Sequence, residues 1–218
     1  MLFLAKIVSM IFKINFKLSL KNLFFWFLCE VQLNDRILKI KKGQNMINEK
    51  KSLKAIEDFE SHYNYDASNM HEMLKENPKA YATFEAFMPM SGFVDKAPKD
   101  VIYVAKLTSI KNEDCGTCVQ LNVDMAIEAG VDKEIIKEII FNEGKGLAPE
   151  LKFIYDFTLL VGNKKEISIS MYEKLDKMYG RNVLIEIALA ISASKVFPTI
   201  KRVLNYMTSC SKVQIKVK

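Results

Sequence analysis

The sequence predicts an all-α protein built as a compact multi-helix domain, and three observations carry that prediction. From residue 46 onward, apolar residues recur at steps of three or four, the period of a helix that buries one face. Proline and glycine divide these runs into separate helices. Alternation of apolar and polar residues, the pattern of a strand, is confined to the short tail 212–217.

The first three predicted helices are short, and the second and third end at proline or glycine. In 51–63 the apolar residues share one helical face. The next helix begins near Ser68 and ends before Pro78, because proline disfavours helical geometry at the residue that precedes it. A third helix covers 80–88, and we expect the proline and glycine of 89–92 to end it.

The remaining helical runs are also separated by glycine, proline or capping residues. Gly130 fits a left-handed C-cap, and Pro198 separates the last two runs. The predicted helices are 99–111, 114–129, 132 to Gly144 or Gly146, 149–161, 168–178, 181–196 and 199–208.

The positive charge of the chain is concentrated in its first 45 residues. They hold eight Lys or Arg and two acidic residues, whereas residues 46–218 hold 24 of each kind. Nucleic-acid-binding domains carry clustered basic residues, so the formally neutral 46–218 segment is not expected to bind nucleic acid.

Residues 1–45 form a basic, apolar extension whose role is open. After Met10 their longest uncharged run, 22–29, has eight residues, whereas a membrane-spanning helix needs about 20. No small-residue cleavage site follows that run, as a signal peptide requires. The segment is either a helix lying in a membrane surface or read-through upstream of a true start at Met46.

The four cysteines, at positions 29, 115, 118 and 210, are too few for a disulfide scaffold. A reducing, cytoplasmic location fits them better, and there a Cys-x-x-Cys pair indicates redox, catalytic or metal-binding chemistry. Cys115 and Cys118 stand near the start of the helix 114–129. Residues three apart share a helical face, so a modest adjustment brings the two sulfurs within bonding reach.

Two opposing influences act on these thiols, and other uses of the pair stay open. A helix N-terminus lowers a thiol pKa, whereas the like charges of Glu113 and Asp114 raise it. A zinc site would need two further ligands, but Cys210 stands alone, and His62 and His71 lie far upstream of the helix 114–129. Both cysteines could instead be small core residues. A thioredoxin fold would require a strand before the motif, where 99–111 is predicted to be helical.

The segment 113–121, Glu-Asp-Cys-Gly-Thr-Cys-Val-Gln-Leu, together with 124–126, 128–131 and 196–199, resembles the carboxymuconolactone decarboxylase and alkylhydroperoxidase D superfamily. The resemblance extends over about 65–213. It implies an all-helical fold, attack by Cys118 and resolution by Cys115, and no bound cofactor. It also implies an unidentified dithiol reductant and a homo-oligomer formed by apolar helices, with 181–196 buried on all sides.

The proton relay of the peroxidase relatives is not reproduced in this chain. Their histidine, four residues after the second cysteine, corresponds to Asn122, and their glutamate, twelve before the first, to Tyr103. Asparagine cannot accept a proton near neutral pH. Asp100 and Glu113 are the candidate substitutes.

The expected function is therefore a thiol-disulfide oxidoreductase or weak peroxidase that cycles through a Cys115–Cys118 disulfide. One alternative is a helical oligomerisation or binding module that has kept the fold without catalysis, which the missing histidine and glutamate favour. Another is lactone decarboxylation, which other branches of the superfamily perform without this cysteine pair.

We predict that a chain beginning at Met46 folds, is soluble and unfolds at the same temperature as the full chain. The reasons are that the excess positive charge is confined to residues 1–45 and that this segment shows no proper targeting pattern. Calorimetry on the two chains checks this. Loss of cooperative unfolding in the shorter chain would place residues 1–45 in the core.

Overall fold

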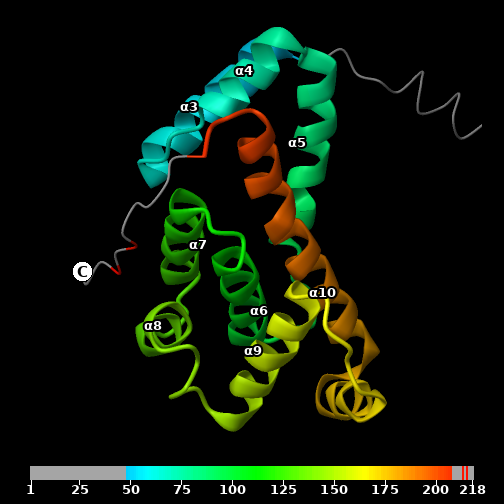
Figure 1. Ribbon diagram of the computed structural model, residues 1–218. Coiled ribbons are helices and arrows are strands. Elements are labelled where there is room, and N and C mark those ends of the chain that lie inside the picture. Colours follow the sequence, from blue (N-terminus) through cyan, green and yellow to red (C-terminus); the bar gives the residue numbers. More distant parts are fainter. Residues whose placement is uncertain (1–47, 208–212, 214, 216–218) are drawn as a thin grey trace, which may run out of the picture. The chain divides into compact units, whose positions relative to one another are not determined.

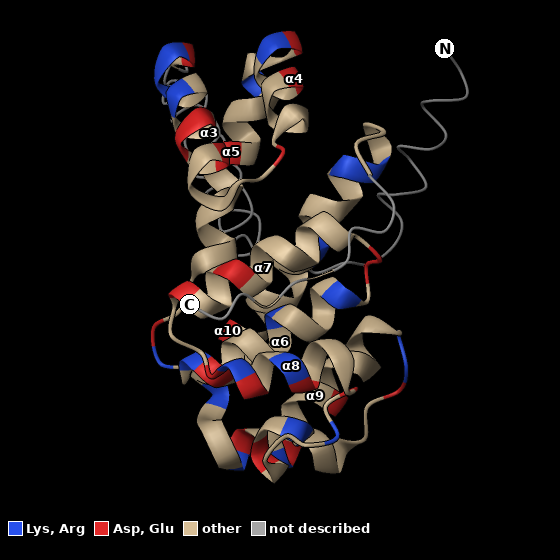
Figure 2. Ribbon diagram, turned by 90° about the vertical axis from the view of Figure 1, so that its left-hand side faces the viewer, with Lys and Arg blue, Asp and Glu red and all other residues tan. Residues whose placement is uncertain are grey.

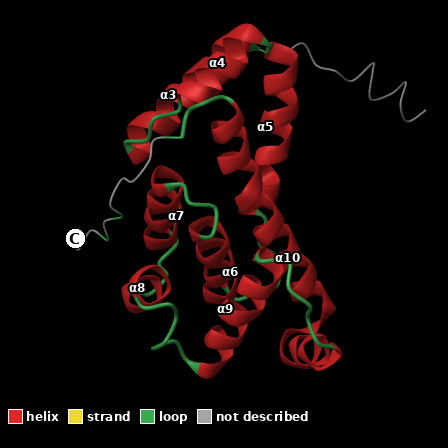
Figure 3. Ribbon diagram, in the orientation of Figure 1, coloured by secondary structure: helices red, strands yellow, loops and turns green. Residues whose placement is uncertain are grey.

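Every regular element in the described part of the chain is an α-helix, as the sequence predicts (Figure 3). The computed structural model describes residues 48–207, 213 and 215. The extension 1–45, Cys29, Cys210 and most of the predicted tail strand lie outside these residues, although Val213 and Ile215 pack against the core. The helices are α3 (Glu49–Tyr63), α4 (Ser68–Glu76), α5 (Pro78–Gly92), α6 (Lys99–Lys111), α7 (Gly116–Glu128), α8 (Lys133–Phe141), α9 (Pro149–Gly162) and α10 (Ile169–Val203).

Helix α6 lies at the centre of the domain and packs against α7, α8, α9 and α10 (Figure 1). Its sequence is apolar nearly all round, and Ile102, Leu107 and Ile110 are fully buried. Burying each such side chain stabilises the fold by about 1.5–3 kcal/mol. The position of α6 therefore determines where its neighbours can pack.

Helices α3, α4 and α5 follow one another along the chain, each packed against the next, and α5 also packs against α10 (Figure 1). Aromatic contacts join α5 to α10, because the Phe197 ring lies 5.7 Å from Phe84 and 5.6 Å from Phe87 between centroids. The first pair is edge-to-face, an arrangement that aromatic rings favour, and the second is tilted. Basic and acidic residues are interspersed on the described helices (Figure 2), and their numbers in 46–218 are equal.

Two prolines that we expected to end helices are inside them. Helix α5 continues through Pro89 to Gly92, and α10 continues through Pro198 to Val203. Each proline sits close to the C-terminal end of its helix, where the missing amide costs a single backbone hydrogen bond. The Phe197 contacts with α5 hold both helix ends in place, so tertiary packing overrides the local preference.

Other boundaries follow the sequence more closely. Gly130 has φ +73° and directly follows the α7 C-cap, with the Val131 amide bonded to the Ala126 carbonyl, as expected for a left-handed cap. Helix α8, however, ends at Phe141 and not at Gly144 or Gly146. The Glu138 side chain accepts hydrogen bonds from Asn142 Nδ2 and the Gly146 amide, which draws the following chain away from the helix axis.

The α10 segment 181–196 is not buried on all sides within one chain. Its inner face is buried, but Ile185 is 51% exposed. At Gly180 the backbone is non-helical, with φ 79°, so 168–178 and 181–196 are separate helical pieces as predicted. By length and composition alone α10 could cross a membrane, a property that buried core helices share. Its packing against α5, α6 and α9 explains that apolar character.

Glu186 of α10 is a buried carboxylate that holds the loop between α5 and α6. It accepts hydrogen bonds from the backbone amides of Asp95, Lys96 and Ala97 at 2.9, 2.8 and 3.1 Å. Burial raises the pKa of this carboxyl, and the hydrogen bonds from the three amides lower it. The lowering is the larger effect, so the pKa lies below its ordinary value. The ionised form is therefore the one that the fold stabilises.

We predict that Glu186→Gln lowers the free energy of unfolding by about 2–4 kcal/mol at pH 7, since an amide turns a donor toward at least one of the three backbone donors. Because the folded pKa is lowered, the stabilisation is full above the ordinary pKa of 4.5 and is lost as the pH falls through the folded value. Urea unfolding at pH 7 and pH 3 measures both effects. The exposed Glu173→Gln on the same helix is the matched control, and equal stability of the two variants would contradict the role of Glu186.

Candidate active site

Cys115 and Cys118 are joined by a disulfide at the start of α7, with their Cα atoms 5.2 Å apart. Cys115 is the N-cap residue with an extended backbone, and Cys118 is the third residue of the helix. Helix α7 therefore begins two residues later than the predicted 114, because Asp114 adopts a left-handed backbone with φ 51°. The predicted pairing of the motif is present, and the left-handed turn places one cysteine just outside the helix.

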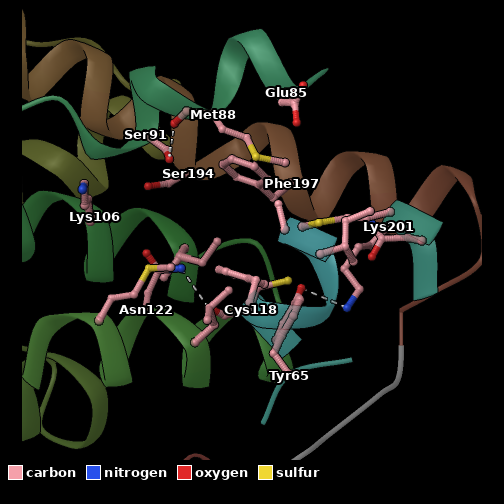
Figure 4. A pocket seen from close by; sticks show the side chains of 18 of the residues that line it. Tyr65, Glu85, Met88, Ser91, Lys106, Cys118, Asn122, Ser194, Phe197 and Lys201 are labelled. Carbon is pink, nitrogen blue, oxygen red and sulfur yellow. Dashed lines mark hydrogen bonds between the residues drawn. The ribbon is translucent and has the colours of Figure 1, made fainter. Parts of the chain in front are cut away.

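Both cysteines are buried, and Cys118 lines a pocket formed by the described helices. Cys115 is 2% exposed and Cys118 is 3% exposed. The pocket has a volume of about 250 Å³ and a mostly apolar lining supplied by α3, α4, α5, α6, α7 and α10. Figure 4 shows the Cys118 side chain among the lining residues. Cys115 is not one of them, so the two sulfurs differ in what can reach them.

Asn122 and Tyr103, which occupy the relay positions of the peroxidase relatives, both line this pocket. Asn122 Nδ2 donates to the Cys118 carbonyl at 2.9 Å, one turn back along α7 (Figure 4). Tyr103 donates its hydroxyl to the Met125 carbonyl at 3.2 Å. Burial, and secondarily the Glu128 carboxylate, raises the pKa of Tyr103. Neither side chain is a base near neutral pH.

Asp100 and Glu113, the substitutes that the sequence offered, are not among the lining residues. Asp100 is half-buried, and its Oδ1 atom has no hydrogen-bond partner in the described part of the chain. Glu113 contributes its backbone carbonyl, which accepts from Arg202 Nη2 at 2.7 Å. Asp114 is exposed. The structure thus separates all three carboxylates from the pocket.

The histidines that a zinc site would require pair with carboxylates on the helices. His62 Nε2 lies 3.1 Å from Glu128 Oε1, and His71 Nε2 lies 2.9 Å from Glu60 Oε2. In the described residues no group of three or more His, Cys, Asp or Glu side chains is placed to hold a metal ion.

Two buried lysines complete the pocket, and the sequence analysis missed both. Lys106 of α6 is 8% exposed and Lys201 of α10 is 2% exposed. A signal for Lys106 was present, since it stands three residues after Tyr103 and four before Ile110, on the face of α6 that lines the pocket. Lys201 lay beyond Pro198, where we expected a separate helix.

Within residues 48–207, Lys201 has polar partners, whereas the contact found for Lys106 is with an aromatic ring. Lys201 Nζ donates to the Tyr65 hydroxyl at 3.1 Å (Figure 4). It also donates to the Asp66 carbonyl at 3.4 Å. Burial, followed by the Asp66 charge, raises the pKa of Tyr65 to about 12. Lys106 Nζ lies 5.1 Å from the centre of the Tyr103 ring. Burial lowers the pKa of both lysines, partly offset at Lys201 by Asp66.

Glu85 is the one carboxylate among the described residues that line the pocket, and it accepts from Ser52 Oγ at 3.1 Å. Two amines and one carboxylate therefore border a mostly apolar space that also holds a redox-type sulfur. No protein-family model, curated protein or solved structure matches this chain, so its resemblance to the alkylhydroperoxidase D superfamily remains a prediction.

Proposed function

We propose that this protein is a thiol-disulfide oxidoreductase or weak peroxidase that works through the Cys115–Cys118 pair. The observation that carries the proposal is the unequal placement of the sulfurs. Cys118 borders the pocket, and Cys115 lies within disulfide distance of it but outside the lining. A substrate in the pocket would meet Cys118 first, which supports Cys118 as the attacking thiol and Cys115 as the resolving thiol.

The cycle begins when the Cys118 thiolate attacks the terminal oxygen of a hydroperoxide. A sulfur–oxygen bond forms, the oxygen–oxygen bond breaks, and the alkoxide leaves and takes a proton to become an alcohol. The Cys115 thiolate then attacks the Cys118 sulfenic acid and releases hydroxide, which is protonated to water. An external dithiol reduces the disulfide by exchange and supplies the two electrons that the peroxide consumed.

The surroundings of Cys118 support a reactive thiolate. Its sulfur is in the first turn of α7, where unpaired backbone amides and the helix dipole favour an anion. Lys106 and Lys201 add positive charge to the same pocket. Asp114, which the sequence suggested would oppose ionisation, is exposed, and water screens its charge.

The non-catalytic binding module remains the second candidate, and the relay positions are the observation that favours it. Asn122 donates its amide to a backbone carbonyl, and Tyr103 does the same with its hydroxyl. A helical module that had lost catalysis would keep such structural bonds. We further propose a cytoplasmic location, a dithiol partner as reductant, and a homo-oligomer that covers the exposed Ile185 face of α10.

We predict that mild peroxide oxidises the reduced protein at Cys115 and Cys118 with loss of two thiols per chain. Cys118→Ser should abolish turnover with a dithiol donor. Cys115→Ser should leave Cys118 as a sulfenic acid or mixed disulfide, because the attacking thiol keeps its reactivity without a resolving partner. Thiol titration and peptide mass spectrometry measure both results.

Cys29→Ser and Cys210→Ser are the controls and should leave turnover unchanged. If Cys115 and Cys118 stay reduced under peroxide and disulfide challenge in the folded protein, the redox proposal fails and the binding module replaces it.

We predict that Asn122→His increases the rate of peroxide reduction, since a positioned acid–base group contributes about 10²–10⁴-fold. Residue 122 lines the same pocket as Cys118, one helical turn further along α7. An imidazole at this position would therefore lie near the reacting sulfur. Stopped-flow oxidation of the two cysteines measures the rate. Asn122→Asp, which offers a weaker base of similar size, is the control. A wild type that already turns over fast would mean that another base serves the site.

A further inference from the structure

Lys106 is a buried amine for which the protein supplies no counter-charge. Its side chain is more than nine-tenths buried, it lines the pocket, and it makes no hydrogen bond or ion pair with any residue that the structure describes. Its contact with the Tyr103 ring stabilises a cation weakly. An ammonium group has three donors, and buried ammonium groups are ordinarily paired. The side chain therefore has unused capacity for an anion.

A second polar group of the lining is also without a partner. Asn69 is 3% exposed, and its Oδ1 atom is buried and makes no hydrogen bond within the described residues. By contrast, the other charged groups of the pocket are engaged. Lys201 binds Tyr65 and Asp66, and Glu85 binds Ser52. Lys106 is thus the charged group of the lining that remains available to a ligand.

The rest of the lining is suited to an apolar body. Its large apolar side chains come from six helices and include Ile56, Phe59, Met70, Met88, Leu121 and Phe197. The volume of about 250 Å³ is slightly below the roughly 300–1,000 Å³ of pockets for drug-sized ligands. A small ligand with a short hydrocarbon chain fits this space better than a sugar or a nucleotide.

We infer that the pocket binds a small apolar carboxylate, with its carboxylate at Lys106 and its hydrocarbon chain along the apolar lining toward Cys118. Figure 4 draws Lys106 and Lys201 on opposite sides of the view with Cys118 between them. A single free amine matches the single charge of a carboxylate better than the double charge of a phosphate, which proteins usually meet with several donors. This inference rests on the proposed function when it names the substrate, a carboxylate-bearing alkyl hydroperoxide whose peroxide group lies at Cys118.

Binding is tested on the full chain in its disulfide form, where no turnover can occur. Octanoate, octan-1-ol and octylammonium share one chain and differ in head-group charge, and isothermal titration compares their affinities. We expect octanoate to bind about 10- to 100-fold more tightly than the other two, the range of a charge-assisted hydrogen bond. Lys106→Met should remove this preference, and the exposed Lys177→Met should keep it.

Several results would overturn the inference. Equal affinity for the three ligands would show that no cationic side chain of the pocket contacts the head group. This comparison needs no variant. Loss of octanoate binding in Lys201→Met, with retention in Lys106→Met, would assign the carboxylate to the other end of the pocket. If Lys106→Met fails to fold by circular dichroism, Lys106→Gln replaces it and should show the same loss of preference.

A kinetic comparison keeps this inference separate from the redox proposal. The reduced protein is oxidised with an alkyl hydroperoxide that carries a terminal carboxylate, and with its methyl ester. Preference for the acid in the wild type, lost in Lys106→Met, supports the inference. Equal rates with both compounds refute the carboxylate site while leaving the redox cycle intact. Octanoate binding without oxidation by either compound refutes the redox proposal alone.

Discussion

The burial of α6 on nearly every side is the constraint on which the remaining structure depends. A helix whose apolar residues occupy most of its circumference must be covered by several neighbours, and here four other helices supply that cover. Lys106 lies in the middle of this buried helix, so its amine is placed by the packing of the core. The same central helix therefore contributes much of the buried core and also positions one of the charged groups of the pocket.

The cysteine pair depends on the adjoining turn between α6 and α7. Asp114 adopts a left-handed backbone there, and the next residue, Cys115, is the extended N-cap of α7. Cys118 then lies one turn into the helix, beside the pocket that α6 also borders. One short connection thus brings the sulfur chemistry to the space where the buried lysines lie.

Much of this arrangement could be predicted from the sequence, and the exceptions have physical causes. Periodicity and proline placement predicted the helices, because those signals are local. Pro89 and Pro198 misled the prediction, because contacts of Phe197 with distant residues hold those helix ends together. The cysteine spacing predicted the disulfide. The pocket could not be predicted, since Lys106, Lys201 and Asn69 are far apart in the sequence and their burial depends on the assembled fold.

The kink at Gly180 divides α10 into a short piece and a long, uninterrupted one, and the long piece links two distant places. It carries Glu186 near its start and Lys201 near its end, a span of about 22 Å at 1.5 Å per residue. Because a helix resists compression along its axis, the distance between the loop amides bound by Glu186 and the pocket residue Lys201 is fixed by this one element. A single rigid helical piece therefore joins the loop between α5 and α6 to the lining of the pocket.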